Sequence, residues 1–171
     1  MSAPQPISPP RPAVSARQIA KAGLVAALYA VLTVFAPVPQ YGGIQFRVAE
    51  AMTVLPFLFP EAVFGLTVGC FVANLFSPFL LDCVVGTSAT LLAALWTSRL
   101  KKPLLAPMPP VVCNAVIVGA EIAWFMAQDG ENFLRAWLFN GFTVGFGELL
   151  ACYVLGLLLL RTLQKLSARR S

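Results

Sequence analysis

The chain has 171 residues, of which 58% are apolar and only 11% are charged, and its mean hydropathy is +0.80. Soluble domains carry about a quarter charged residues, so this composition excludes an ordinary soluble protein and indicates a single membrane-embedded domain. The net charge is +5, but the basic residues avoid the apolar runs, which indicates membrane-surface anchors and no nucleic-acid partner. Histidine is absent from the sequence, which removes the usual general base and the usual zinc ligand.

Proline, glycine and charged residues divide the chain into six apolar runs. Residues 1–16 are rich in proline, serine and alanine, and we expect a disordered cytoplasmic tail there rather than a signal peptide. We expect residues 17–165 to form one membrane domain and residues 166–171 a basic cytoplasmic tail. The six runs predict helices at about 17–36, 48–59, 62–76, 83–98, 108–128 and 137–161, the second being too short to cross upright. The expected fold class is therefore an all-α membrane protein, a bundle of six transmembrane helices.

The basic residues predict the orientation of this bundle. If the N-terminus is cytoplasmic, the inner helix ends carry ten of them: Arg11, Arg17, Lys21, Arg99, Lys101, Lys102, Arg161, Lys165, Arg169 and Arg170. The outer ends carry only Arg47 and Arg135. Because cytoplasmic loops are enriched in Lys and Arg, we expect both termini in the cytoplasm of a multi-pass protein of the bacterial cell membrane.

A polar segment interrupts the apolar sequence after the first run. The stretch YGGIQFRVAEAMTVL, residues 41–55, contains Arg47 and Glu50 one helical turn apart. The two side chains could simply neutralise each other. Ionisable groups beside hydrocarbon also mark ligand sites, which is the second interpretation of the pair.

Further polar residues are expected at similar depth in the outer half of the bundle. Glu121 and Glu148 are the most informative, because a carboxylate in a lipid-facing helix costs about 2.5–3.5 kcal/mol and must therefore face the interior. Each could be a purely structural hydrogen-bonding group, but the number of polar groups favours a pocket for a flat, donor-rich small molecule, neutral or cationic, stacked on aromatic rings. The candidate substrate-binding residues are Gln45, Arg47, Glu50, Asn74, Asp82, Asn114, Glu121, Trp124, Asn140 and Glu148.

Small residues recur along the first helix. Ala22, Ala26 and Ala30 repeat every four residues, with Gly23 and Ala27 on the adjoining stripe. Such stripes let membrane helices approach closely, either within the bundle or against another membrane protein, and the three alanines are candidate partner-docking residues. A similar glycine pair in the last helix is assigned to internal packing. The four cysteines lack metal-ligand or redox spacing, so they are interpreted as small buried apolar residues.

Five segments, covering about residues 18–163, together resemble a known family. In order they are YGGIQFRVAEAMTVLPF, GLTVGCFVANLF, LDCVVGTSATLLAAL, PPVVCNAVIVG and GELLACYVLGLLLL. They resemble the QueT family, the queuosine-precursor substrate-binding (S) subunits of energy-coupling factor (ECF) transporters. The resemblance implies an S-component fold that binds a 7-deazaguanine, such as preQ1 (aminomethyl) or preQ0 (cyano), beneath the loop joining helices 1 and 2. It also implies docking of the alanine stripe onto a transmembrane coupling subunit, which two ATPase subunits would power.

Other functions stay open at this point. The sequence contains no G-x-x-x-x-G-K-[ST] phosphate loop, so ATP must be hydrolysed by a partner. An S subunit for a flavin or thiamine and a solitary small-solute carrier are the alternatives. An enzyme using Glu121 and Glu148 as an acid–base pair is disfavoured, because neither an activated nucleophile nor a metal cluster is indicated. We therefore expect no catalytic residues, no metal and no cofactor.

Overall fold

The computed structural model describes residues 15–36 and 47–169, and its regular structure is entirely helical. The α-helices are α1 (Ala16–Phe35), α2 (Ala62–Asn74), α3 (Val85–Thr97), α4 (Met108–Cys113), α5 (Gly119–Gln128), α6 (Phe133–Leu149) and α7 (Leu157–Ala168). The 3₁₀-helices are η1 (Val48–Phe57), η2 (Leu80–Cys83) and η3 (Pro103–Leu105), and the π-helices are η4 (Asn114–Val118) and η5 (Leu150–Gly156). Gln45 and all but the last two residues of the expected N-terminal tail lie outside the described residues.

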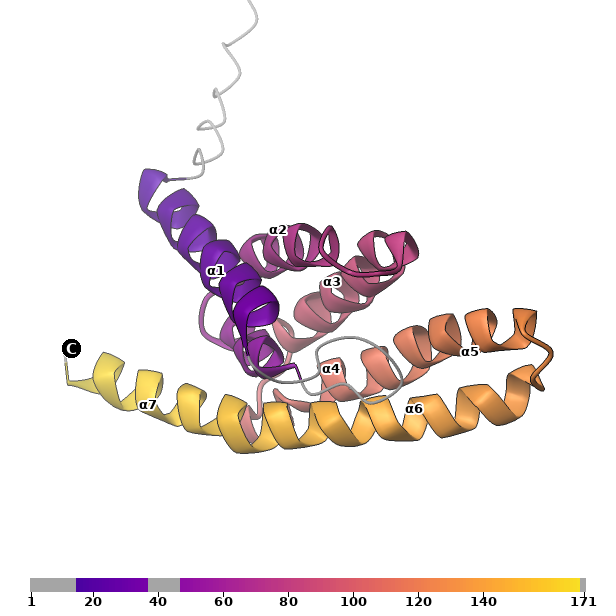
Figure 1. Cartoon of the computed structure of the whole chain (residues 1–171). Coiled ribbons are helices and arrows are strands. Elements are labelled where there is room, and N and C mark those ends of the chain that lie inside the picture. Colours follow the sequence, from indigo (N-terminus) through magenta and orange to yellow (C-terminus); the bar gives the residue numbers. More distant parts are fainter. Residues whose placement is uncertain (1–14, 37–46, 170–171) are drawn as a thin grey trace, which may run out of the picture.

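These elements join into six helical segments within the described part of the chain. Four of the segments are long and apolar enough to cross a membrane: Ala16–Phe35, Leu80–Thr97, Pro103–Gln128 and Phe133–Ala168. The other two, η1 and α2, are apolar but shorter. The prediction of an all-α membrane protein with six helices is therefore confirmed. In Figure 1, α1, α2 and α3 form one group, and α4 and α5 run beside the long helix that contains α6 and α7.

Polar and apolar side chains are distributed opposite to the pattern of a soluble protein. Large apolar side chains are exposed on almost every helix, for example Phe35, Phe64, Phe142 and Leu158. Charged and amide side chains are buried in the middle of the bundle. This distribution is stable only where lipid covers the outside and the buried polar groups find partners inside.

Local sequence explains where α1 begins and ends. The Ser15 hydroxyl accepts a hydrogen bond from the Gln18 backbone N–H, and the Gln18 side chain accepts one from the Ser15 N–H, which makes a capping box. At the other end, Ala36 has extended backbone angles, φ −67° and ψ 132°. The following residue is Pro37, and a residue before proline is pushed out of the helical region. The first helix therefore spans the predicted range closely.

Two pairs of helices approach through small residues. A Cβ added to Gly65 of α2 would lie 2.5 Å from the Ala22 carbonyl oxygen, and one added to Gly69 would lie 2.7 Å from that of Ala26. Between α5 and α6, a Cβ on Gly119 would lie 2.8 Å from the Gly141 Cα. Such contacts let backbones pack closely in a lipid environment, where apolar burial gives no drive for association. The assignment of the last helix's glycines to internal packing is confirmed.

The helix boundaries differ most from expectation in the last segment. It begins at Phe133 rather than near Trp137, and it continues to Ala168 instead of ending near Arg161. At about 1.5 Å per residue, its 36 residues extend about 54 Å, longer than the hydrocarbon layer of about 30 Å. The extra length falls largely in α7, whose exposed basic residues suit the membrane surface.

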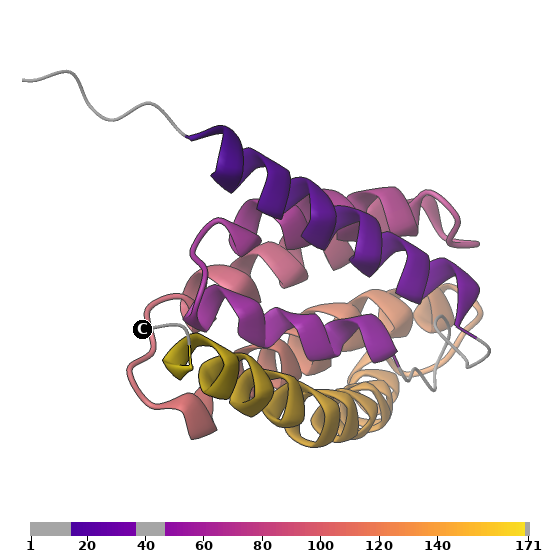
Figure 2. The same ribbon diagram turned by 90° about the vertical axis from the view of Figure 1, so that its left-hand side faces the viewer.

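Basic residues gather at one end of the molecule. Figure 2 places the start of α1, the connection between α3 and α4, and the end of α7 at the same end. Lys21 of α1 also pairs with Glu61, the residue before α2, at 2.8 Å, so these two helices start at the same level. Basic segments that are far apart in the sequence therefore lie at one end of the folded molecule, which is the arrangement that the positive-inside rule requires.

Candidate functional site

Eight of the ten candidate binding residues are buried in the structure. Glu50 is fully buried, and Glu121, with Asp82 the most accessible of the eight, is only 5% exposed. The eight are Arg47, Glu50, Asn74, Asp82, Asn114, Glu121, Asn140 and Glu148. Burial of this many charged and amide groups in an otherwise apolar chain requires that they contact one another or a guest.

One group of buried residues, here called the Glu148 network, connects four parts of the chain. The Tyr29 hydroxyl of α1 donates to the carboxyl of Glu50 in η1, and the Glu50 backbone carbonyl accepts from Thr53 at 2.6 Å. Cys152 of η5 contacts that same carbonyl at 3.4 Å and the Glu148 carboxyl at 3.6 Å. Asn114 of η4 donates to the other oxygen of Glu148 at 2.9 Å. Side chains from separate helices therefore converge at this point.

Irregular helical geometry coincides with the Glu148 network. Asn114 opens the π-helix η4, and Glu148 lies two residues before the π-helix η5, which contains Cys152. Glu50 lies in η1, a 3₁₀-helix of 10 residues, although 3₁₀ runs longer than three or four residues are uncommon. Segments of π- and long 3₁₀-helix occur preferentially at functional sites, which supports a binding role for this region.

A second group, here called the Asp82 cluster, consists of Asn74, Ser77, Asp82 and Glu121. Ser77 donates to the Asp82 carboxylate, and the Asn74 amide nitrogen donates to the Asp82 backbone carbonyl at 2.8 Å. The negative charge of Asp82 acts on the Glu121 carboxyl of α5. Gly86 makes room for this arrangement, because a Cβ there would lie 2.9 Å from the Asn74 amide nitrogen. These hydrogen bonds tie η2 to the end of α2.

The positive charge of Arg47 acts on residues of both groups. The guanidinium is 2% exposed, and its charge acts on Glu50 and Glu148 of the Glu148 network and on Glu121 of the Asp82 cluster. The charge of Arg47 therefore acts on all three buried glutamates, and their sharing of one binding site stays a prediction. The Arg47–Glu50 spacing is part of this larger cluster and not an isolated neutralising pair.

Several buried oxygens in these groups have no hydrogen-bond partner within the described part of the chain. They are Glu50 Oε2, Asn74 Oδ1, Asn114 Oδ1 and both carboxyl oxygens of Glu121. All are acceptors when the acids are ionised. A buried acceptor without a donor is destabilised by about 1–3 kcal/mol, so this arrangement suits a guest that brings N–H donors. Within residues 15–36 and 47–169, no three His, Cys, Asp or Glu side chains are grouped to hold a metal ion.

Two candidate residues are placed away from these groups. The Trp124 indole is 57% exposed, so the expectation that it faces the interior beside Glu121 is wrong. The reason is that lipid-facing and interior surfaces of this helix are both apolar. Asn140 is buried, but its amide nitrogen donates to the Ala136 carbonyl of its own helix at 2.8 Å and to Met126 Sδ at 3.1 Å. Neither residue joins the Glu148 network or the Asp82 cluster through a described hydrogen bond.

The alanine stripe of α1 also has a definite position. Ala22 and Ala26 are the residues whose backbone meets Gly65 and Gly69, so both take part in packing within the chain. A Cβ added to Gly23, on the adjoining stripe, would meet nothing within 4 Å, and Ala27 is exposed. Ala22 and Ala26 also line the open groove between α1 and α2 together with Gly23, and Ala30 is half-buried, so the docking role of the stripe stays a prediction.

Sequence reasoning missed several members of the site. Tyr29 is the clearest case: its ring is fully buried and its hydroxyl holds Glu50. A signal existed, since Tyr29 lies seven residues after Ala22 and so shares its inward helix face. Cys152 was expected to be only a small buried apolar residue; it is buried, and its thiol also contacts Glu50 and Glu148. The four cysteines form no disulfide with one another.

Comparisons with known proteins identify the family of the chain. Residues 19–165 match the family described as QueT transporter. Among curated proteins, the chain is similar to the queuosine precursor transporter QueT of Lactococcus lactis subsp. cremoris (strain MG1363), with 37% identity over 70 residues. That match covers 40% of this chain and 41% of the relative, so the chain aligns with less than half of the relative's length. No solved structure matches the chain. Because the family match extends from α1 to the last helix, the chain belongs to the QueT transporter family.

Proposed function

We propose that this chain is the substrate-capture subunit of an ECF-type transporter and that it binds a queuosine precursor, a 7-deazaguanine, from outside the bacterial cell. The observation that carries the proposal is the set of buried acceptor oxygens without donors at Glu50, Asn74, Asn114 and Glu121. The edge of a deazaguanine ring presents several N–H donors, and carboxylate and amide oxygens are suited to accept from them. The name of the Lactococcus lactis relative, a queuosine precursor transporter, supports the same ligand class.

The orientation of the chain gives the direction of capture. With the basic end of the bundle in the cytoplasm, both termini are cytoplasmic and the start of η1, at the opposite end in Figure 2, lies toward the outside. The guest enters near the outer end of the bundle, and Gln45 lies outside the described residues. The capture domain comprises residues 17–165, and transport then requires that the pocket open inward.

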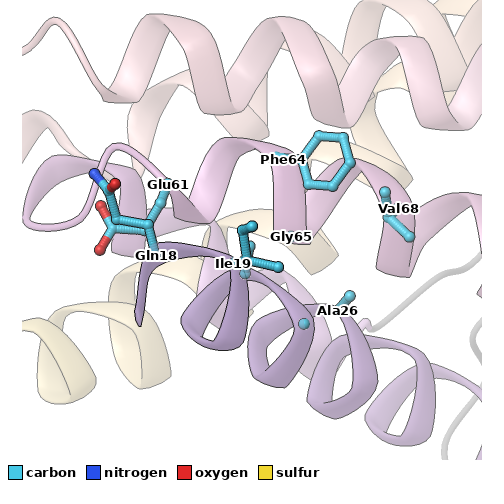
Figure 3. Close-up of a pocket in the computed structure, with 9 residues that line it drawn as sticks. Gln18, Ile19, Ala26, Glu61, Phe64, Gly65 and Val68 are labelled. Atoms are coloured by element: carbon cyan, nitrogen blue, oxygen red, sulfur yellow. The ribbon is translucent and has the colours of Figure 1, made fainter. Parts of the chain in front are cut away.

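The partner is a transmembrane coupling subunit that two ATPase subunits drive. A groove of about 640 Å³ runs between α1 and α2 and is open to one side (Figure 3). Gln18 and Glu61 lie at one end of it, and the rest of its lining is apolar and includes Gly23. An apolar groove with a glycine at its edge lets a partner helix approach closely in the membrane. Energy comes from the partners, because the chain itself contains no phosphate-binding loop.

Equilibrium binding tests the proposal. Purified protein in detergent is titrated with labelled 7-deazaguanine precursor, and we expect saturable binding that an excess of unlabelled flavin or thiamine does not displace. Glu50→Gln replaces one acceptor by a donor and should weaken binding by about 1.5–3 kcal/mol, roughly ten- to 150-fold. Glu131→Gln, the same change at an exposed position, is the matched control and should bind as the wild type does.

Two results would contradict the proposal. Displacement by flavin or thiamine but not by deazaguanines would assign the chain to another vitamin. Uptake by proteoliposomes that contain only this chain, without ATP or partner subunits, would make it a solitary carrier.

A further inference from the structure

A second groove runs along another face of α1, away from the groove that Gly23 lines. It has a volume of about 790 Å³, and among the described residues that line it only Lys21 and Glu61 are charged, the others being apolar. Its floor is η1, and its two walls are α1 and the last helical segment. Figure 2 shows η1 lying between these two helices. The groove is therefore a channel along the outside of the bundle, with charged side chains at one end.

Rows of leucines form both walls of this groove. They recur every four residues on each helix, as Leu24, Leu28 and Leu32 in α1 and as Leu155, Leu159 and Leu163 in the last segment. Residues four apart lie on the same helix face, so each row borders the groove along its length. Leu24 is 61% exposed and Leu28 is 46% exposed, whereas the side chains of the floor, for example Met52, are buried. The groove is therefore closed beneath and open between its walls.

The length of the groove matches one leaflet of a bilayer. From Lys21 to Leu32, α1 rises by about 16 Å at about 1.5 Å per residue. The hydrocarbon layer of a membrane is about 30 Å thick, so one leaflet contributes about 15 Å. A groove that starts at the basic end of the bundle therefore reaches about as far as the acyl chains of the leaflet at that end.

The charged end of the groove carries an excess of positive charge. Lys21 pairs with Glu61 at 2.8 Å, and this ion pair uses one of the three N–H donors of the ammonium. The Lys21 side chain is 43% exposed, so its remaining donors are accessible from outside. Arg17 is exposed and lies one turn before Lys21 on the same helix face. Two cations and one carboxylate leave one positive charge, which the single negative charge of a phosphate diester would balance.

The two grooves of α1 differ in the residues that line them. The groove between α1 and α2 is lined by Ala22, Gly23, Ala26 and Gly65, and such small residues let another helix approach closely. The walls of the second groove are leucines, which hold a helix backbone at a distance but make many dispersion contacts with a thin, flexible chain. The second groove is therefore suited to an acyl chain and not to a partner helix.

We propose that this groove binds one anionic glycerophospholipid from the leaflet at the basic end of the bundle. An acyl chain lies between the two leucine rows, and the phosphate accepts hydrogen bonds from Lys21 and Arg17. The lipid covers η1, the 3₁₀-helix whose Glu50 belongs to the Glu148 network, and fills the open side between α1 and the last segment. It therefore stabilises the fold, whatever ligand the polar centre takes.

Native mass spectrometry and thermal unfolding of the purified full-length protein test the proposal. Protein freed of lipid in detergent is titrated with phosphatidylglycerol or with phosphatidylcholine of the same acyl chains. We expect one phosphatidylglycerol to be retained per chain, with an affinity at least about fivefold higher than that of phosphatidylcholine, and to raise the unfolding temperature. Inorganic phosphate should not displace it, because the acyl chain supplies much of the binding.

Two pairs of variants locate the bound lipid. Leu28→Trp fills the groove and should abolish retention, whereas Leu92→Trp, at a 52% exposed leucine of α3 outside the groove, should retain the lipid. Arg17→Gln should lower the affinity for phosphatidylglycerol by about fivefold and leave that for phosphatidylcholine unchanged. Arg161→Gln removes the same charge from an exposed position that does not line the groove, and it should bind as the wild type does. The charge variants keep the test decisive if Leu28→Trp does not fold.

Three results would overturn the inference. One is equal affinity for the two lipids. Another is an equal loss of affinity in Arg17→Gln and Arg161→Gln, which would show a general attraction of anionic lipid to the basic end. The third is normal lipid retention by Leu28→Trp together with loss of uptake, which would assign the groove to a partner subunit. None of these results bears on the ligand of the polar centre, so the proposed function is tested separately.

Discussion

The seam between α1 and α2 and the polar centre of the bundle are held together by opposite kinds of contact. At the seam, Ala22 and Ala26 meet Gly65 and Gly69 at backbone distance, and almost no polar side chain takes part. At the centre, polar side chains of α1, η1, α2, η2, η4, α5 and α6 are buried, and some of their acceptors are left without donors among the described residues. The seam is complete without a guest, whereas the centre is not.

This difference shows how structure and function are separated in the chain. Close-packed small residues stabilise helix pairs through dispersion alone and tolerate no added volume. Unpartnered buried acceptors destabilise the empty protein and are satisfied when a guest binds. Substitutions at the seam should therefore affect folding or assembly, and substitutions at the centre should affect binding.

The most severe effect is expected from Gly65→Leu. The new Cβ would lie 2.5 Å from the Ala22 carbonyl oxygen, which is backbone and cannot move without separating α1 from α2. We expect a loss of stability of about 3 kcal/mol or more, seen as aggregation or a much lower unfolding temperature in detergent. Gly23→Leu on the facing helix, where a Cβ meets nothing within 4 Å, is the control and should stay folded. If Gly65→Leu unfolds at the same temperature as the wild type, the seam is not close-packed.

The same control variant should be inactive in transport. Gly23 lines the open groove between α1 and α2, so a leucine there should block approach of the coupling subunit while leaving the polar centre untouched. Under the proposed function, we expect unchanged ligand affinity and loss of uptake in cells that express all subunits. Ser88→Leu, an exposed small residue on α3, tests whether added bulk at the lipid surface is enough by itself. Normal uptake by Gly23→Leu would remove the groove as a docking surface.

Tyr29→Phe tests the structural part of the polar centre. The variant keeps the ring but removes the hydroxyl that donates to Glu50, so a buried carboxyl loses its donor. We expect a decrease in stability of about 1–3 kcal/mol, measured by thermal unfolding. Tyr153→Phe, at a half-buried position in η5 outside the Glu148 network, should change the unfolding temperature little. If the two substitutions lower the unfolding temperature equally, the hydrogen bond of the Tyr29 hydroxyl does not contribute to stability.

The sequence was sufficient for the helices and for the polarity of the interior. Apolar runs bounded by proline and charge mark membrane helices because the bilayer requires about 20 apolar residues per crossing. Buried acids were predictable as well, since Glu121 and Glu148 have no stable place against lipid. Both arguments need only the composition of short segments, which is why they succeeded.

The direction of apolar side chains was not predictable in the same way. In a membrane helix, lipid and protein interior are both apolar, so hydrophobicity does not tell which face of α5 carries Trp124. The two small-residue stripes of α1 present the same problem, and only the positions of Gly65 and Gly69 decide that Ala22 and Ala26 face inward. The π-helices η4 and η5 were not predicted from the sequence either, and the Asn114–Glu148 hydrogen bond joins the start of η4 to the residues just before η5.

The smallest effect is expected at the end of the seam where α1 and α2 begin. Lys21 pairs with Glu61 at 2.8 Å and lies over the Phe59 ring at 4.9 Å, but its side chain is 43% exposed, so the ion pair should contribute no more than about 1 kcal/mol. The Lys21 ammonium lowers the pKa of the Glu61 carboxyl below its ordinary value. A carboxyl whose pKa is lowered in the folded protein stabilises the fold fully at a pH above its ordinary pKa, about 4.3. This stabilisation disappears as the pH falls through the lowered pKa.

Glu61→Gln should therefore lower the unfolding temperature slightly at pH 7 and leave it unchanged in acid, where the wild-type carboxyl is itself protonated. Lys21→Met removes the contact with Phe59 as well, so a difference between the two variants at neutral pH measures the cation–π contribution, about 0.5–1 kcal/mol at an exposed site. If Glu61→Gln destabilises the protein equally at both pH values, the carboxylate charge is not what joins α1 to α2 at this end. The small-residue contacts would then account for the seam by themselves.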